Sequence, residues 1–220
     1  MFNPEAPPEL AVSRWFNITE PITLAGLKGK VVVLTAFQML CPGCVEHGLP
    51  QAKRLRQRFS SQEVAVIGLH TVFEHHKAMT EDSLEAFLHE YRWPFPVGVD
   101  MANGTAMPKT MAAYEMQGTP TLLLFDREGR LRRHYFGKPD DIMLAAEIMA
   151  MAIEDSGAPR QQAAGIEKKL ASVLVNPEHD THHHHDHDHD HEHGDDCGCG
   201  HDHAHGAHDV HHHRADGKTR

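Results

Sequence analysis

The chain has 220 residues, 40% of them hydrophobic, which is enough for one domain of ordinary size with additional material. No apolar run approaches the ~18 residues that a membrane-spanning helix needs, so we expect no membrane segment. The first 20 residues lack the basic start and apolar stretch of a secretory signal, and we therefore expect a cytoplasmic location.

Histidine is distributed very unevenly along the chain. Of 22 histidines, 16 lie in residues 178–220. That segment has a formal charge of −8, against −10 for the whole chain, so the remainder is nearly neutral. A near-neutral body does not indicate nucleic-acid binding, whereas an acidic, imidazole-rich segment suits metal cations.

The first strong structural signal is the run VVVLTAF at residues 31–37, which is rich in β-branched residues. Such a run predicts a strand that is buried on both faces. The motif CPGC follows at residues 41–44. From residue 45 to 59, apolar side chains recur at spacings of three and four, which predicts a helix directly after the motif.

Gly48 and Pro50 predict a kink in this helix. Residues 63–69 then form a second apolar run, which ends at His70. The order strand, helix, strand predicts a right-handed crossover between parallel strands, with the cysteines at the first strand-to-helix junction.

The second half of the chain alternates between helical and strand patterns. Thr80, followed by acidic residues, marks the start of a helix. Asp126 to Gly129 have the composition of a turn between two strands of a hairpin. In chain order we expect a helix from 80 to 91, a strand at 96–99, a helix at 107–116, strands at 121–125 and 131–136, and helices at 140–154 and 161–174.

After Pro177 the chain is almost free of apolar residues. Such a segment cannot bury enough surface to offset its chain entropy, so we expect residues 178–220 to be disordered without a ligand. The acidic residues among the histidines favour native sequence over a purification tag. Imidazole, carboxylate and thiolate groups bind Zn, Ni or Cu. The expected ligands are His182, His183, His184, His185, His187, His189, His191, His193, Cys197, Cys199, His201, His203 and His205.

The four cysteines form two close pairs, Cys41/Cys44 and Cys197/Cys199, which indicates redox or metal chemistry rather than a disulfide scaffold. At a helix N-terminus, the dipole stabilises a thiolate at Cys41, and Cys44 is one turn away, placed to attack a mixed disulfide. The alternatives are a structural zinc half-site, for which the folded part has no second CxxC, and inert cysteines.

Two segments, LAGLKGKVVVLTAFQMLCPGC and GTPTLLLFDREGRL, resemble the thioredoxin-fold thiol–disulfide oxidoreductases of the TlpA-like and redoxin (AhpC/TSA-type) branch, over residues 12–155. The resemblance implies an α/β fold of the thioredoxin-like three-layer α/β/α kind, with a central mixed sheet. The tail expected to be disordered from its composition follows this domain. The resemblance also implies that Pro120 is a cis-proline facing the cysteines. Such a proline leaves a backbone edge available to substrate and prevents the dithiol from binding metal. Thr119 would contact substrate. An ordinary trans turn is the alternative.

The chain departs from this family at several positions. Leu40 stands where a Trp often precedes the first cysteine, and Thr35 stands where thioredoxins have a buried acid. His47 takes the place of a TlpA-type Glu, with Glu46 beside it. A local bulge would bring one of these two near the thiols as an acid–base group, and the alternative is that both are solvated helix residues.

Residues 70–76 follow the second strand and contain three histidines and Glu74. A loop at this point lies at the carboxyl ends of the parallel strands, on the same rim as the cysteines. We therefore expect either a metal-binding or substrate-positioning loop, or a polar loop without a ligand.

The sequence as a whole predicts a cytoplasmic disulfide reductase in which Cys41 attacks and Cys44 resolves. Its division would be a thioredoxin-like domain at 1–156, a linker with a short helix at 157–177 and a metal-binding tail at 178–220. Its partners would be protein or small-molecule disulfides, an unidentified electron donor and divalent metal ions. We expect no organic cofactor, no nucleic acid and no membrane.

Two other functions remain as alternatives. The first is a metal buffer or metallochaperone carried by the same fold; in a coupled version, the dithiol keeps Cys197 and Cys199 reduced. The second is a peroxiredoxin-like antioxidant protein. Peroxiredoxins have Pro and Thr seven and three residues before the reactive cysteine, where this chain has Leu34 and Gln38, so direct peroxidase activity is disfavoured.

Overall fold

The computed structural model describes residues 2–105, 107–154, 157 and 159–174. Contacts divide the chain into two units, Met1–Asn176 and Pro177–Arg220, and the description that follows concerns the first. The tail and its expected metal ligands, from His182 to His205, lie outside the described residues. Within the described part, no helix has both the length and the apolar character needed to span a bilayer.

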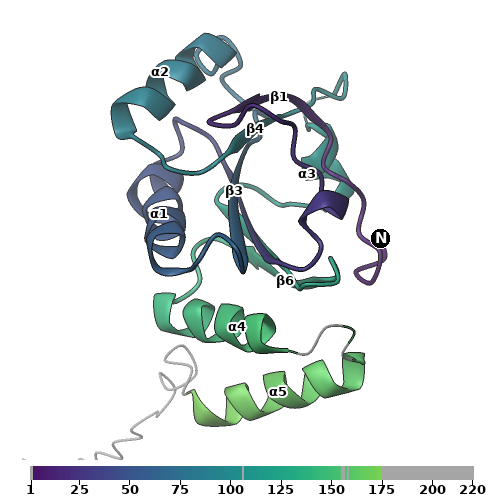
Figure 1. Cartoon of the computed structure of the whole chain (residues 1–220). Helices are drawn as coiled ribbons and strands as arrows, with labels where there is room; N and C mark the ends of the chain where they lie inside the picture. The colour runs from purple at the N-terminus through teal and green to yellow at the C-terminus, as the bar shows by residue number, and fades with distance from the viewer. Residues whose placement is uncertain (1, 106, 155–156, 158, 175–220) are drawn as a thin grey trace, which may run out of the picture. The chain divides into compact units, whose positions relative to one another are not determined.

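A six-stranded mixed sheet forms the centre of the first unit (Figure 1). The strands are β1 (Val12–Phe16), β2 (Val31–Phe37), β3 (Val64–His70), β4 (Val97–Asp100), β5 (Thr121–Phe125) and β6 (Leu131–Phe136). They are arranged in the order β1-β4-β3-β2-β5-β6. The pairs β2–β3 and β3–β4 are parallel and the other pairs antiparallel, which confirms the predicted parallel crossover. All seven residues of β2 are buried, as its β-branched composition predicts.

The predicted helices follow in the expected order, and a short 3-10 helix that was not predicted precedes them. They are a 3-10 helix (Ala25–Leu27), a π-helix (Cys44–Gly48), α1 (Leu49–Arg58), α2 (Glu81–Tyr91), α3 (Lys109–Ala113), α4 (Asp141–Ile153) and α5 (Arg160–Val173). Two of them begin at side-chain caps where the sequence predicts a start. Thr80 accepts a hydrogen bond from the N–H of Ser83, and Asp140 accepts from the N–H groups of Ile142 and Met143.

Two predictions about the elements need correction. The strand β1 was not expected, and it pairs with β4 at the edge of the sheet. The helix expected at 107–116 is only Lys109–Ala113, because Glu115 has a positive φ of 53°, which a right-handed helix does not accommodate.

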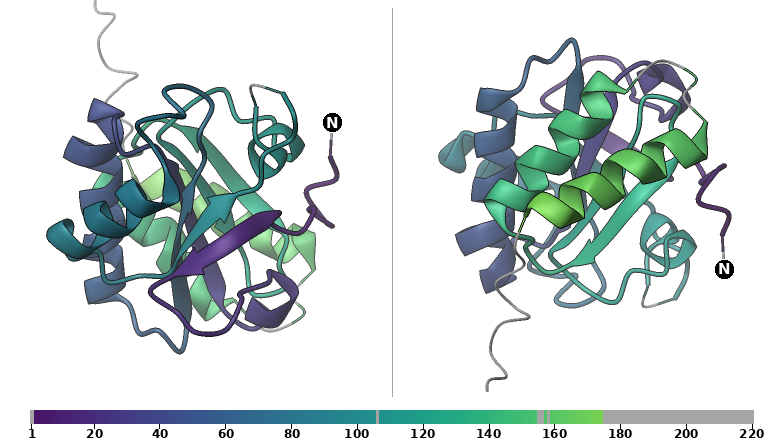
Figure 2. Two further views of the ribbon diagram at one scale, coloured as in Figure 1. Left: turned by 90° about the horizontal axis from the view of Figure 1, so that it is seen from above. Right: turned by 90° about the horizontal axis from the view of Figure 1, so that it is seen from below.

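The two faces of the sheet carry separate hydrophobic cores. One is formed with α1, α2 and α4, and the other with α3 and the N-terminal segment, so the unit has three layers. The right-hand view of Figure 2 shows α5 packed across α4. The first core includes Phe37, Cys44, Leu49, Leu84, Phe95 and Ile148, and the second includes Leu34, Ile67, Met111, Tyr114, Leu123 and Phe125.

A buried cluster of charges connects the β5–β6 hairpin to the end of α4. The guanidinium of Arg132 lies 3.1 Å from Asp126 and 2.9 Å from Glu154, and the side chains of Arg132 and Asp126 have no exposed surface. Arg130 makes a second contact with Asp126 at 2.8 Å. Breaking a buried pair of this kind typically destabilises a protein strongly, because the remaining charge has no partner.

Candidate active site

The two cysteines lie where β2 ends and a helix begins. The N–H of Cys41 donates to the carbonyl of Gln38 at 3.2 Å, which closes a turn after the strand. The N–H of Cys44 donates to the carbonyl of Cys41 at 3.0 Å and also to its sulfur at 3.3 Å. The sulfur of Cys41 therefore lies at a helix N-terminus, where it accepts a hydrogen bond from an amide N–H.

The two thiols differ sharply in their exposure. Both are free, but Cys41 is half-buried and Cys44 has no exposed surface. Burial, and to a smaller extent the hydrogen bond with Cys41, raises the pKa of the Cys44 thiol to about 12. The backbone of Gln38 and the side chain of Thr119 act in the opposite direction. Only Cys41 is thus available to a substrate in solution.

The segment Thr119–Pro120 faces the cysteines across the site. Its peptide bond is cis, as the family resemblance implies. The thiol of Cys41 donates to the carbonyl oxygen of Thr119 at 3.3 Å, and the carbonyl of Pro120 accepts from the N–H of Gly137 at 2.8 Å. The structure therefore brings together all four residues that the sequence singled out around the dithiol.

The predicted kink is a π-helical turn over Cys44–Gly48, in which the N–H of Leu49 bonds to the carbonyl of Cys44. Pro50 accounts for it, because a proline inside an α-helix has no N–H and its ring clashes with the carbonyl four residues earlier. Glu46 and His47, the two proposed acid–base groups, are both exposed, and neither has a described hydrogen bond to a sulfur.

Two buried polar residues lie beside the dithiol. Thr35, where thioredoxins have an acid, is 1% exposed, and its hydroxyl has no hydrogen-bond partner among the described residues. Gln38 was not predicted as part of the site. It is 1% exposed and holds the following loop, since its side chain donates to Glu74 and accepts from the N–H of Phe73, both at 3.3 Å. A polar residue directly after a buried strand is the signal that identifies it.

The loop at 70–76 lies at the same end of the sheet as the cysteines, because Gln38 contacts it. Of the alternatives for this loop, the metal site is wrong. No group of three or more His, Cys, Asp or Glu side chains suited to a metal occurs in the described part of the chain. His70 points into the core, where it packs on Phe37 with ring centroids 5.3 Å apart, while His75 and His76 are exposed.

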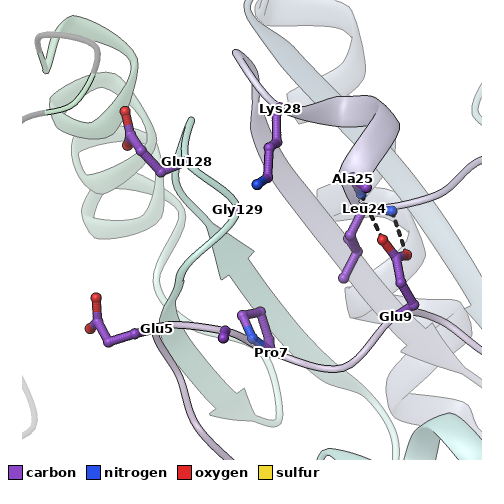
Figure 3. A pocket seen from close by; sticks show the side chains of 9 residues that line it. Glu5, Pro7, Glu9, Leu24, Ala25, Lys28, Glu128 and Gly129 are labelled. Carbon is purple, nitrogen blue, oxygen red and sulfur yellow. Dashed lines mark hydrogen bonds between the residues drawn. The ribbon is translucent and has the colours of Figure 1, made fainter.

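A pocket of about 250 Å³ lies between the N-terminal segment, the 3-10 helix and the β5–β6 turn (Figure 3). The carboxylate of Glu9 at its wall accepts the N–H groups of Leu24 and Ala25, both at 2.8 Å, and so caps the short helix. Neither cysteine lines this pocket, and neither does Thr119 or Pro120. It is therefore separate from the dithiol.

Comparison with known proteins places this geometry in a family. The model of the AhpC/TSA family matches residues 7–134. The thioredoxin-like superfamily protein SPOA0173 is 58% identical, with a TM-score of 0.67, over 69% of this chain and 97% of its own. A thiol-disulfide isomerase from Corynebacterium glutamicum is 45% identical, with a TM-score of 0.66, over 69% of this chain and 98% of its own. The search of curated proteins finds no match. The chain therefore belongs to the AhpC/TSA family and has a thioredoxin-like fold.

Proposed function

We propose that this thiol–disulfide oxidoreductase is a disulfide reductase in which Cys41 is the nucleophile and Cys44 the resolving thiol. The observation that carries the proposal is the asymmetry of the pair. Cys41 is accessible at a helix N-terminus and accepts an N–H, while Cys44 is enclosed beneath it. A substrate can thus reach one sulfur only, and the second acts after the first has reacted.

In the first step, the Cys41 thiolate attacks one sulfur of a substrate disulfide. The substrate S–S bond breaks, a mixed disulfide forms at Cys41, and the other substrate sulfur leaves and takes up a proton. In the second step, Cys44 loses its proton to solvent and attacks the Cys41 sulfur. This forms the Cys41–Cys44 disulfide and releases the second substrate thiol. An external thiol donor then reduces the Cys41–Cys44 disulfide, which replaces the two electrons that the substrate gained.

Thr119 and Pro120 would position the substrate. The carbonyl of Thr119 already accepts a hydrogen bond from Cys41, so a chain attached to that sulfur lies against this segment. In the reducing cytoplasm that we propose as the location, exchange would run toward reduction of the substrate, and protein or small-molecule disulfides would both be acceptable.

The test is turnover of a peptide with a single disulfide by the full-length protein, with dithiothreitol as the electron donor. Cys41→Ser should abolish turnover, and Cys44→Ser, mixed with the peptide without dithiothreitol, should stop at one mixed disulfide per chain. The matched control is Cys197→Ser with Cys199→Ser, which should retain the rate. Undiminished turnover by Cys41→Ser would refute the assignment.

We propose as well that the tail binds divalent transition metals. The support is its sequence, with 16 histidines and one Cys-Gly-Cys in 178–220. Both hydrophobic cores lie before Glu154, so a chain ending at Pro177 keeps them. Titration with Ni or Zn should load several ions on the full chain and none on the shortened one, while turnover is the same for both. Equal metal uptake by the two chains would contradict this proposal, and loss of turnover on shortening would favour the metal-buffer alternative.

A further inference from the structure

The ring of Pro120 is held against two glycines of the helix that carries Cys44. A Cβ atom at Gly48 would lie 3.0 Å from Cβ and 3.5 Å from Cγ of Pro120. At Gly43, a Cβ would lie 3.4 Å from Cδ of the same ring. The first distance is shorter than a normal carbon contact, so Gly48 leaves no room for a side chain unless its neighbours move.

Glycine is not needed at these positions for its backbone freedom. Gly43 has φ −60° and ψ −30°, and Gly48 has φ −62° and ψ −52°, which are ordinary right-handed helical values that any residue adopts. Glycine is also a poorer helix former than alanine. What the sequence gains from Gly48 is therefore the close approach of the helix to Pro120.

The π-turn explains how both glycines reach one ring. In an α-helix, residues five apart point about 140° away from each other. In a π-turn, hydrogen bonds join residues five apart, so such residues lie on the same face. Gly43 and Gly48 are separated by five residues, and the turn between them is π-helical. Without the π-turn, only one of them would face Pro120.

The position of Pro120 matters because of its neighbour. The carbonyl of Thr119 accepts a hydrogen bond from the thiol of Cys41, and the carbonyl of Pro120 is bonded to Gly137. We propose that Gly48 is a positioning residue for the dithiol, which acts through the Pro120 ring to keep the Thr119 carbonyl in contact with Cys41. This role rests on the proposed function, because it concerns the reactivity of the same thiol.

The direction of the effect follows from the hydrogen bond. Cys41 can donate to Thr119 only as a reduced, protonated thiol, so this contact stabilises the protonated dithiol relative to the disulfide. A methyl group at position 48 has Pro120 on one side and Cγ2 of Thr35, 3.8 Å away, on the other. It would displace Pro120, weaken this contact and shift the equilibrium toward the Cys41–Cys44 disulfide.

The experiment compares full-length Gly48→Ala with Gly165→Ala. Gly165 is also helical, but apart from its own helix backbone no atom of the described residues lies within 4 Å of an added Cβ, so its variant controls for the change of residue. The Cys41–Cys44 equilibrium is measured in glutathione redox buffers by trapping free thiols. We expect Gly48→Ala to shift this equilibrium at least threefold toward the disulfide, and Gly165→Ala to leave it unchanged.

A second variant tests whether the effect of the added methyl group is steric. It also serves as the test if Gly48→Ala alone does not fold. Thr35→Ser removes the methyl group on the other side of position 48, so Gly48→Ala with Thr35→Ser should move the equilibrium back toward that of Thr35→Ser alone. A wild-type equilibrium in Gly48→Ala, whatever its melting temperature, would overturn the proposal, as would the same shift with and without Thr35→Ser. The glutathione equilibrium does not require turnover, so failure of the proposed function would be seen separately.

Discussion

The sulfur of Cys41 lies 3.3 Å from the carbonyl oxygen of Thr119, although 78 residues separate them in the chain. The strand β5, which begins directly after Pro120, pairs with β2, which ends just before the cysteines, and this pairing joins the two segments. A substrate attached to Cys41 would therefore lie beside the half-buried segment Thr119–Pro120. Cys41 and the Thr119–Pro120 segment thus lie at the same end of two neighbouring strands in the middle of the sheet.

The resolving step should accelerate with pH. The pKa of Cys44 is raised to about 12 by burial, so only a small fraction of this thiol is ionised near neutrality. The thiolate fraction, and with it the rate of release from the mixed disulfide, should rise about tenfold per pH unit between about pH 7 and 9. Single-turnover release of a labelled peptide measures this rate. A plateau below pH 9 would show that a nearby base takes the proton, and Cys44→Ser should release no peptide at any pH.

His70 should make the fold less stable in mild acid. Burial lowers the pKa of His70 to about 4, against about 6.5 in the unfolded chain. As the pH falls below about 6.5, the unfolded chain takes up a proton that the folded protein does not, so stability is lost progressively down to about pH 4. At pH 5 the loss amounts to about 2 kcal/mol.

Urea unfolding at pH 7.5 and pH 5 measures this dependence. His70→Leu removes the imidazole and should reduce the difference between the two pH values by that amount. The exposed His76 is the matched position, and His76→Leu should retain the wild-type difference. An unchanged pH dependence in His70→Leu would contradict the prediction.

The buried charge cluster should respond strongly to the loss of its cation. Arg132→Met removes the cation of Glu154 and leaves Asp126 with Arg130 alone, and it should reduce the free energy of unfolding by about 3–5 kcal/mol. Arg54 makes an exposed pair with Asp141, and Arg54→Met should change the free energy of unfolding by less than about 1 kcal/mol. Equal losses in the two variants, measured by urea unfolding, would show that burial does not decide the effect.

Gly68 in β3 has no space for a side chain. An added Cβ would lie 3.0 Å from Val97, 3.1 Å from Phe95 and 3.2 Å from Phe37. Gly68→Ala should therefore destabilise the fold by about 1–3 kcal/mol through overpacking. Thermal unfolding checks this, with Gly165→Ala as the control that should cause no loss. A melting temperature equal to the wild type would mean that the two rings can move apart.

Much of the fold was predictable because local patterns and tertiary contacts agree. The apolar run of β2 is buried along its whole length, and the caps at Thr80 and Asp140 begin helices as expected. The edge strand β1 was missed because only Phe16 of its five residues is buried. A strand with so little burial has no alternation that a sequence pattern can detect.

The site was predictable only where the chemistry lies within a short motif. The CPGC motif and the Thr-Pro pair are such motifs, and the structure brings them together. The contacts of Gln38 and Gly48 depend on residues far along the chain, at Glu74 and Pro120. The direction of His70 was also undetermined, because a strand that is buried on both faces gives no sign of which side each residue takes.

The burial of Cys44 has a consequence for the oxidation of Cys41 by oxidants in solution. If Cys41 is oxidised to a sulfenic acid, a second thiol stands next to it in the same helical turn. Condensation of the two gives a disulfide and water, which ends the oxidation at a level that a thiol donor can reverse, before sulfinic acid forms. Since Cys44 has no exposed surface, an oxidant in solution cannot reach it first, so the protecting thiol stays intact until it is needed.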